Sequence, residues 1–228
     1  MTVINNARLR HALGILLPFV IIPALVAAGA YFIDEKRHLV ISLGVVSLAL
    51  LLFWCGFERR EMGSRRAVLL AVMVALCVIG RIIPIFKPVT AIVVITAVYL
   101  GKETGFACGA LAALISNFMS SQGPWTPFQM LGWGLIGLFA GCMPKLLAKS
   151  KTAIVIYGVF SGILFSLVMD VWTVLHYNGI FSFELYLLAL LESLPHTAIY
   201  AVSNVIFLFF MAKPFGDKLS RIKIKYGV

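Results

Sequence analysis

The sequence predicts an all-α integral membrane protein, and its composition, its apolar runs and its distribution of basic residues each support that fold class. Hydrophobic residues make up 61% of the 228 residues and charged residues only 12%. A soluble domain is about half apolar and a quarter charged. One globular core of this size cannot bury the surplus, so lipid must solvate much of the surface.

Eight apolar runs follow one another along the chain. A bilayer core about 30 Å thick needs roughly 20 apolar residues per helix. The runs cover residues 12–32, 38–57, 66–83, 88–101, 103–120, 126–144, 153–176 and 184–212. The fourth run is short and only Gly101-Lys102-Glu103 separates it from the fifth. Seven spans is therefore the alternative count.

The basic residues favour eight spans with both termini in the cytoplasm. With the N-terminus inside, 15 of the 19 Lys and Arg residues fall on the cytoplasmic side, as the positive-inside rule requires. The loops 82–87, 121–125 and 177–183 are then external. A basic soluble protein would suggest nucleic acid, but no nucleic-acid motif accompanies these residues, so we expect no such partner.

The chain divides near residue 60. Residues 1–60 comprise a plain hydrophobic hairpin followed by a basic linker, Glu58 to Arg66, that runs into the second part. The first run is longer than a signal-peptide core and a second span follows it closely, so we interpret it as a membrane anchor. Polar and small residues collect within the spans of residues 61–228, where we expect the function. The cysteines lie in apolar runs without CxxC pairs, which predicts buried thiols rather than disulfides or metal ligands: Cys55, Cys77, Cys108 and Cys142.

The segment 116–130 is the most informative polar stretch. A turn between two helices needs Gly or Pro, but it does not need amides, hydroxyls and a Trp together. The pattern predicts a polar-aromatic ligand surface, with these candidates: Asn117, Gln122, Pro124, Trp125 and Thr126. Interfacial anchoring is the alternative role for Trp125. Thr126 followed by Pro127 fits an N-cap and first-turn pair.

Ionisable residues near the predicted outer ends of the spans are further candidates. A carboxylate within a transmembrane helix is costly and normally faces a cavity or a partner. The candidates are Arg81, Lys87, Asp170, His176, Tyr177, Glu192 and His196. The alternatives are snorkelling of the two cations to lipid phosphates and a buried Asp170–Arg81 pair. The spacing does not require a metal site.

Two stripes of small residues permit close helix packing. One consists of Ala67, Ala71 and Ala75, and the other of Gly105, Gly109 and Ala113. Small residues four apart lie on one helix face. Each stripe predicts either packing within the chain or a docking face for another membrane subunit.

Four segments carry a resemblance to a known family. Gly80-Arg81 with Pro84 and Lys87-Pro88, then residues 105–117, 122–130 and 134–141, resemble the substrate-binding S component of energy-coupling factor (ECF) vitamin transporters. The similarity covers roughly residues 61–228. It implies a six-helix core with a cavity open to the outside. Two extra spans precede that core here, which departs from the family pattern.

The resemblance also implies partners. Ala67, Ala71 and Ala75 resemble the alanine motif that docks the S component on a transmembrane coupling subunit. That subunit works with two ATP-binding-cassette (ABC) ATPases in the bacterial plasma membrane. The chain would bind ligand without chemistry or cofactor, and it has no phosphate-binding loop of its own.

The ligand predicted from the resemblance is cobalamin. The pattern from Gln122 to Met130 is most similar to members assigned to cobalamin, an amide-rich corrinoid with one phosphodiester. The same side chains would suit a benzimidazole, pantothenate or a queuosine precursor. Metal-transporting members use a histidine at position two, where this chain has Thr2.

Two other classes of protein remain as alternatives. An intramembrane enzyme would use Ser161, or a metal at Asp170, His176 and His196. Residues 158–162 place the serine one position out of register for a Gly-x-Ser-Gly motif. A structural or assembly factor would bind no small molecule.

Overall fold

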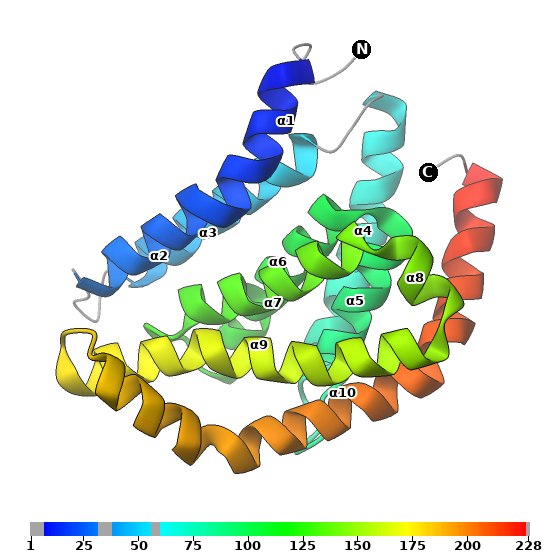
Figure 1. Ribbon diagram of the computed structural model, residues 1–228. Helices are drawn as coiled ribbons and strands as arrows, with labels where there is room; N and C mark the ends of the chain where they lie inside the picture. The colour runs from blue at the N-terminus through cyan, green and yellow to red at the C-terminus, as the bar shows by residue number, and fades with distance from the viewer. Residues whose placement is uncertain (1–6, 32–37, 56–59, 227–228) are drawn as a thin grey trace.

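A computed structural model describes residues 7–31, 38–55 and 60–226, and all regular structure in these ranges is helical (Figure 1). The first helical rod comprises α1 (Ala7–Leu16), a π-helical turn η1 (Leu17–Ile21) and α2 (Ile22–Tyr31). The other helices are α3 (His38–Cys55), α4 (Arg60–Gly80), α5 (Val89–Leu100), α6 (Lys102–Ser120), α7 (Thr126–Cys142), α8 (Pro144–Lys149), α9 (Lys151–Asn178) and α10 (Phe183–Tyr226). Each of the eight predicted runs corresponds to one helical rod.

The helices have the apolar character of membrane spans. Within the described residues, three are long and apolar enough to cross a bilayer by length and composition: Arg8–Ala28, Lys151–Asn178 and Phe183–Tyr226. Shorter apolar helices cover Val40–Leu52 and Val89–Leu100. The predicted all-α membrane fold is confirmed, whereas the sidedness of the termini stays a prediction.

The short helix α5 is the centre of the core. Eleven of its twelve residues are buried, and it packs against α4, α6, α7 and α10. A helix that is apolar on every face must be buried on every face, which accounts for the Val-, Ile- and Ala-rich sequence. Gly101 separates α5 from α6 with φ of 105°, a backbone conformation that favours glycine.

A glycine seam joins α6 to α7. A Cβ atom added to Gly109 would lie 2.4 Å from the backbone carbonyl carbon of Trp133, and one added to Gly137 would lie 2.4 Å from the carbonyl carbon of Gly105. The backbones therefore approach more closely than any larger side chain permits. Gly105, Gly109 and Ala113 are buried, so this stripe serves packing within the chain.

The N-terminal hairpin packs on the outside of the core. Helix α3 contacts α6 and α7, and α2 contacts α7. Val45, Ala49 and Leu52 of α3 are fully buried in that contact layer. Helix α4 begins at Arg60, so the second part of the predicted linker is helical; Glu58 and Arg59 lie outside the described residues.

Helices α9 and α10 form a long antiparallel pair. Gly158 lies against Asn204 and Leu208, and Gly162 lies against the backbone of Ala201. Helix α10 contains Pro195 and Pro214 and curves around the core (Figure 1). It continues 14 residues beyond the predicted end at residue 212. At about 1.5 Å per residue, the 44 residues of α10 extend over about 66 Å, roughly twice the thickness of the bilayer core. We therefore expect its basic C-terminal part to lie outside the hydrocarbon layer.

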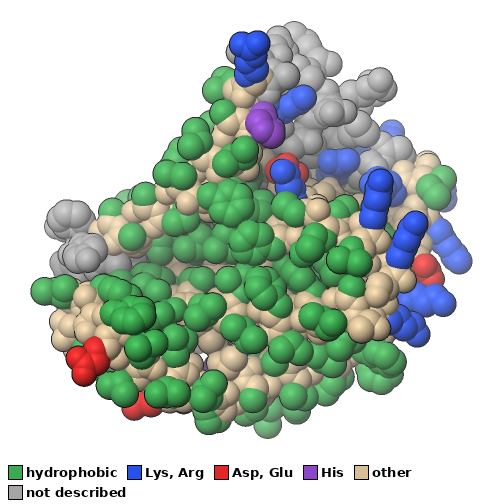
Figure 2. All heavy atoms as spheres, viewed as in Figure 1, with side chains coloured by type: hydrophobic (Ala, Val, Ile, Leu, Met, Phe, Trp, Pro, Cys, Tyr) green, Lys and Arg blue, Asp and Glu red, His purple; other side chains and the backbone are tan. Residues whose placement is uncertain are grey.

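Basic side chains gather at one end of the molecule (Figure 2). This end contains the N-terminal part of α1, the α8–α9 corner and the end of α10. An Arg65 guanidinium nitrogen donates to the Tyr226 carbonyl oxygen, which joins the start of α4 to the end of α10 there. Cys77 and Cys108 are buried, but Cys142 is exposed because α7 ends at that residue, so the prediction of a buried thiol is wrong at Cys142.

Candidate ligand-binding site

Six polar side chains from α4, α6, α7 and their connections form one hydrogen-bonded group, here called the amide cluster: Arg81, Ser116, Asn117, Gln122, Thr126 and Gln129. The Arg81 guanidinium donates to Ser116 Oγ at 2.5 Å and to Gln129 Oε1 at 3.2 Å. Asn117 Nδ2 donates to Gln129 Oε1 at 2.9 Å and to Thr126 Oγ1 at 2.8 Å. Three helices thus converge on one polar interior.

The connection between α6 and α7 completes the cluster. Thr126 Oγ1 donates to Gln122 Oε1 at 2.9 Å, and Gln122 Nε2 donates to the Leu114 carbonyl oxygen at 3.1 Å. The Trp125 ring covers Gly123 so closely that a Cβ atom there would lie 2.3 Å from the ring. The N-cap residue of α7 is Trp125 and Thr126 is the first helical residue, so the prediction that Thr126 caps the helix is wrong. Its hydroxyl instead bonds the side chains of Asn117 and Gln122, and it accepts a hydrogen bond from the Gly123 backbone N–H at 3.5 Å.

An aromatic row extends from the amide cluster across α7, α9 and α10. Arg81 Cζ lies 5.1 Å from the centroid of the Trp133 ring. From there the ring centroids are 4.9 Å apart for Trp133 and Phe165, 5.5 Å for Phe165 and Tyr200, and 4.6 Å for Tyr200 and His196. A cation and several flat rings side by side suit a ligand with an aromatic heterocycle.

Two buried polar atoms in this region have no hydrogen-bond partner. Asn117 Oδ1 and Trp133 Nε1 belong to side chains that are only 1% and 2% exposed. Leaving such an atom unpaired costs about 1–3 kcal/mol. One acceptor and one donor in this region therefore keep unused hydrogen-bonding capacity.

Arg81 and Lys87 form a cationic pair without a carboxylate. Among the described residues, no carboxylate forms an ion pair with either side chain; Glu103 instead lies 4.0 Å from Lys102. Burial lowers the pKa of the Lys87 ammonium from its ordinary value, and the positive charge of Arg81 lowers this pKa further. The Lys87 backbone N–H donates to Ser203 Oγ at 3.1 Å, which attaches the connection after α4 to α10.

The other predicted site residues lie on the α9–α10 pair. Asp170 is buried and accepts a hydrogen bond from Ser193 Oγ at 2.7 Å, and no ion pair joins it to Arg81. His176 stacks on Trp172 with ring centroids 5.0 Å apart, and Tyr177 beside it is 83% exposed.

Glu192 and His196 have exposed side chains, although the His196 ring touches Tyr200. These two residues and Asp170 make no hydrogen bond with the amide cluster in the described structure. Their part in binding stays a prediction.

The residues proposed for an intramembrane enzyme are not arranged as a catalytic site. No group of three or more His, Cys, Asp or Glu residues in the described chain is placed to hold a metal ion, so Asp170, His176 and His196 form no such group. The buried Ser161 Oγ donates to the Tyr157 carbonyl oxygen of its own helix at 2.7 Å.

Comparison with known proteins gives the family. The family model described as "ECF-type riboflavin transporter, S component" matches residues 62–215, well over half of the chain. The chain belongs to this family. It is a multi-pass membrane protein and the substrate-binding subunit of an ECF importer, not an enzyme. No curated protein and no solved structure matches it.

The alanine stripe of this S component is exposed. Ala67, Ala71 and Ala75 line an apolar groove of about 610 Å³ along α4. Leu50 of α3 and Met119 of α6 border the same groove. In contrast to the buried glycine stripe of α6, these alanines leave a helix face open for another helix.

Sequence reasoning missed several residues of the site. Gln129, Trp133, Phe165 and Tyr200 carry much of the geometry but were not selected as candidates. Gln129 and Trp133 follow Thr126 at spacings of three and seven on α7, which places all three on one helix face. That spacing was the available signal; Phe165 and Tyr200 lie in uniformly apolar helices and offered none.

Proposed function

We propose that this S component captures cobalamin at the amide cluster, on the outer side of the membrane. The observation that carries the proposal is the cationic pair of Arg81 and Lys87, to which no carboxylate of the described residues forms an ion pair. Cobalamin supplies one phosphodiester, whose single negative charge would offset one of the two positive charges. A desolvated charge is most stable when it is paired and hydrogen-bonded.

The amides of the cluster support the same ligand. Asn117 of α6, Gln129 of α7 and Gln122 in the connection between them carry amide donors and acceptors. A corrinoid carries peripheral amides that pair with such groups. Sequence similarity at residues 122–130 points to the same vitamin.

Riboflavin is the second candidate. The matching family is described by that vitamin, and the aromatic row provides flat surfaces for a tricyclic ring. Trp133 Nε1 and Asn117 Oδ1 are a free donor and acceptor that a flavin carbonyl and imide N–H would satisfy. Riboflavin is uncharged, so it would leave the cationic pair without a partner.

Transport requires partners that this chain does not contain. We infer that the groove lined by Ala67, Ala71 and Ala75 docks on the coupling subunit, which works with two ABC ATPases in a bacterial plasma membrane. The groove's exposure and small side chains support close helix contact. Because α3 borders the groove, the extra hairpin would flank the docked subunit.

A thermal-shift screen of the detergent-purified protein against water-soluble vitamins tests the proposal. A ligand that binds the folded state alone raises the melting temperature by mass action. A shift with cobalamin alone supports the proposal. A shift with riboflavin alone replaces the ligand and retains the family role, and no shift with any vitamin contradicts capture by the isolated subunit.

A further inference from the structure

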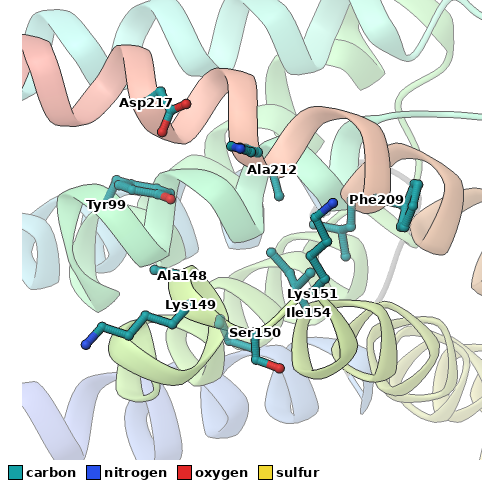
Figure 3. A pocket seen from close by; sticks show the side chains of 12 residues that line it. Tyr99, Ala148, Lys149, Ser150, Lys151, Ile154, Phe209, Ala212 and Asp217 are labelled. Carbon is teal, nitrogen blue, oxygen red and sulfur yellow. The ribbon is translucent and has the colours of Figure 1, made fainter.

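A second polar site lies at the opposite, basic end of the molecule. A pocket of about 300 Å³ opens between α5, the α8–α9 corner and α10. Figure 3 shows Tyr99, Lys149, Lys151 and Asp217 around it. Its buried floor is apolar and consists of Leu147, Ile154 and Leu208.

The rim of the pocket has an excess of positive charge. Lys149, Lys151 and Lys213 line it, together with the single carboxylate of Asp217. No ion pair within 4.0 Å joins Asp217 to any of these lysines. The pocket therefore keeps two positive charges in excess, and its ammonium groups are not held by a protein anion.

The long helix α9 begins at the pocket. Ser150 is its N-cap, and its side chain accepts a hydrogen bond from the Ala153 backbone N–H at 3.1 Å. The N-terminal turn of a helix carries partial positive charge and favours a nearby anion. This dipole adds to the lysines at the same place.

The pocket sits where the apolar spans end. Phe209 is 50% exposed and Phe210 is 69% exposed on α10, and the Lys151 ammonium lies 5.5 Å from the centroid of the Phe209 ring. Lys213 and Asp217 follow on the next turns. Basic residues that follow an apolar span are expected where lipid phosphates meet the edge of the hydrocarbon layer, and the exposed Phe209 and Phe210 add an apolar surface suited to acyl chains.

We propose that this pocket binds the headgroup of an anionic phospholipid through its phosphodiester. Basic pockets between transmembrane helices on the cytoplasmic side bind anionic headgroups. Here the lysine side chains and the N-terminal dipole of α9 would both attract the lipid phosphate. The site is distinct from the amide cluster and does not depend on which vitamin is carried. Lysines that only orient the chain in the membrane attract anionic lipid without saturation. A specific site instead binds one lipid per protein and prefers an anionic over a zwitterionic headgroup.

Native mass spectrometry of the delipidated full chain tests the proposal. The protein is titrated with phosphatidylglycerol or with phosphatidylcholine of the same acyl chains. We expect one phosphatidylglycerol to be retained much more strongly than phosphatidylcholine. Equal retention of the two lipids would overturn the proposal.

Matched triple variants locate the site. Lys149→Gln, Lys151→Gln and Lys213→Gln together should weaken phosphatidylglycerol binding about tenfold or more. Lys145→Gln, Lys218→Gln and Arg221→Gln remove the same charge from exposed residues of the same end and should leave it near the wild-type value. Equal losses in the two variants would overturn the proposal. If the first triple fails to fold, Lys151→Gln alone is compared with Lys145→Gln.

Two further measurements distinguish a bound lipid from a soluble anion and from a protein partner. Displacement of the lipid by millimolar inorganic phosphate would assign the pocket to a soluble anion and overturn the lipid assignment. Loss of coupling-subunit co-purification with unchanged lipid binding in the pocket variant would assign it to a protein partner, which would also overturn it.

Discussion

The Arg81 guanidinium lies over the indole of Trp133, with Cζ 5.1 Å from the ring centroid, while its nitrogens donate to Ser116 and Gln129. This one side chain joins the polar and the aromatic parts of the site. It comes from the end of α4, whereas its partners belong to α6 and α7. A ligand that binds the guanidinium would therefore act on α4, α6 and α7 at the same time.

Removing the Trp125 ring should weaken vitamin binding. The ring covers Gly123 in the connection between α6 and α7, beside the amide cluster, and is only partly buried. Trp125→Ala should reduce affinity by about tenfold, comparable to the loss of one aromatic contact, with little change in melting temperature. Titration calorimetry of the purified variant measures this, and Phe210→Ala on the exposed surface of α10 is the control. Unchanged affinity would show that the α6–α7 connection is not part of the binding site.

The glycine seam between α6 and α7 should not tolerate a methyl group. Gly109→Ala places a Cβ atom 2.4 Å from the Trp133 backbone. We expect a loss of about 1–3 kcal/mol, the usual cost of overpacking, seen as a lower melting temperature in detergent. Gly14→Ala in α1 meets no atom within 4 Å and should be neutral or slightly stabilising. Equal melting temperatures for the two variants would contradict the close backbone packing of α6 against α7.

A large side chain on the alanine stripe should block assembly without affecting capture. Ala71→Trp fills the groove along α4, so we expect co-purification with the coupling subunit to be lost while vitamin binding is kept. Val72→Trp is the control, since Val72 is exposed on the same helix but does not line the groove. Assembly of the Ala71→Trp variant at wild-type level would contradict the docking assignment.

Binding of an anionic ligand should weaken at alkaline pH. Burial and the charge of Arg81 lower the pKa of Lys87, so its ammonium loses its proton at a lower pH than an ordinary lysine. Affinity should therefore fall as pH rises through this lowered pKa, since the neutral amine no longer attracts the anion. Calorimetric titrations across alkaline pH measure the decline. The same decline in Lys87→Gln would show that another group causes it.

The sequence predicted the helices well because lipid imposes one rule on all of them. Each span needs about 20 apolar residues, and breaks such as Gly101 are visible as glycine and charge. The short helix α5 was found despite its 12 residues, because its neighbours were also apolar. The extension of α10 to Tyr226 was not predicted because the apolar run ends at residue 212 and basic residues follow, although Leu219 is buried against the core.

The site was harder to predict because helix faces in a membrane protein are not marked by polarity alone. Asn117, Gln122 and Thr126 were recognisable as an excess of polar residues in a turn, and the structure brings them together with Arg81. The signal for Trp133 was only its spacing of seven residues from Thr126, since its burial depends on the close approach of α6.

The most direct test of the central claim is the affinity of the purified protein for cobalamin and for riboflavin, measured by titration calorimetry with wild type and Arg81→Gln. Arg221→Gln, at an exposed residue of the basic end, is the matched control. We predict that wild type and the control bind cobalamin, and that Arg81→Gln binds it at least about 30-fold more weakly, since a buried charge partner is worth about 2 kcal/mol or more. Cobalamin binding that is absent in wild type, or unchanged in Arg81→Gln, would contradict the claim.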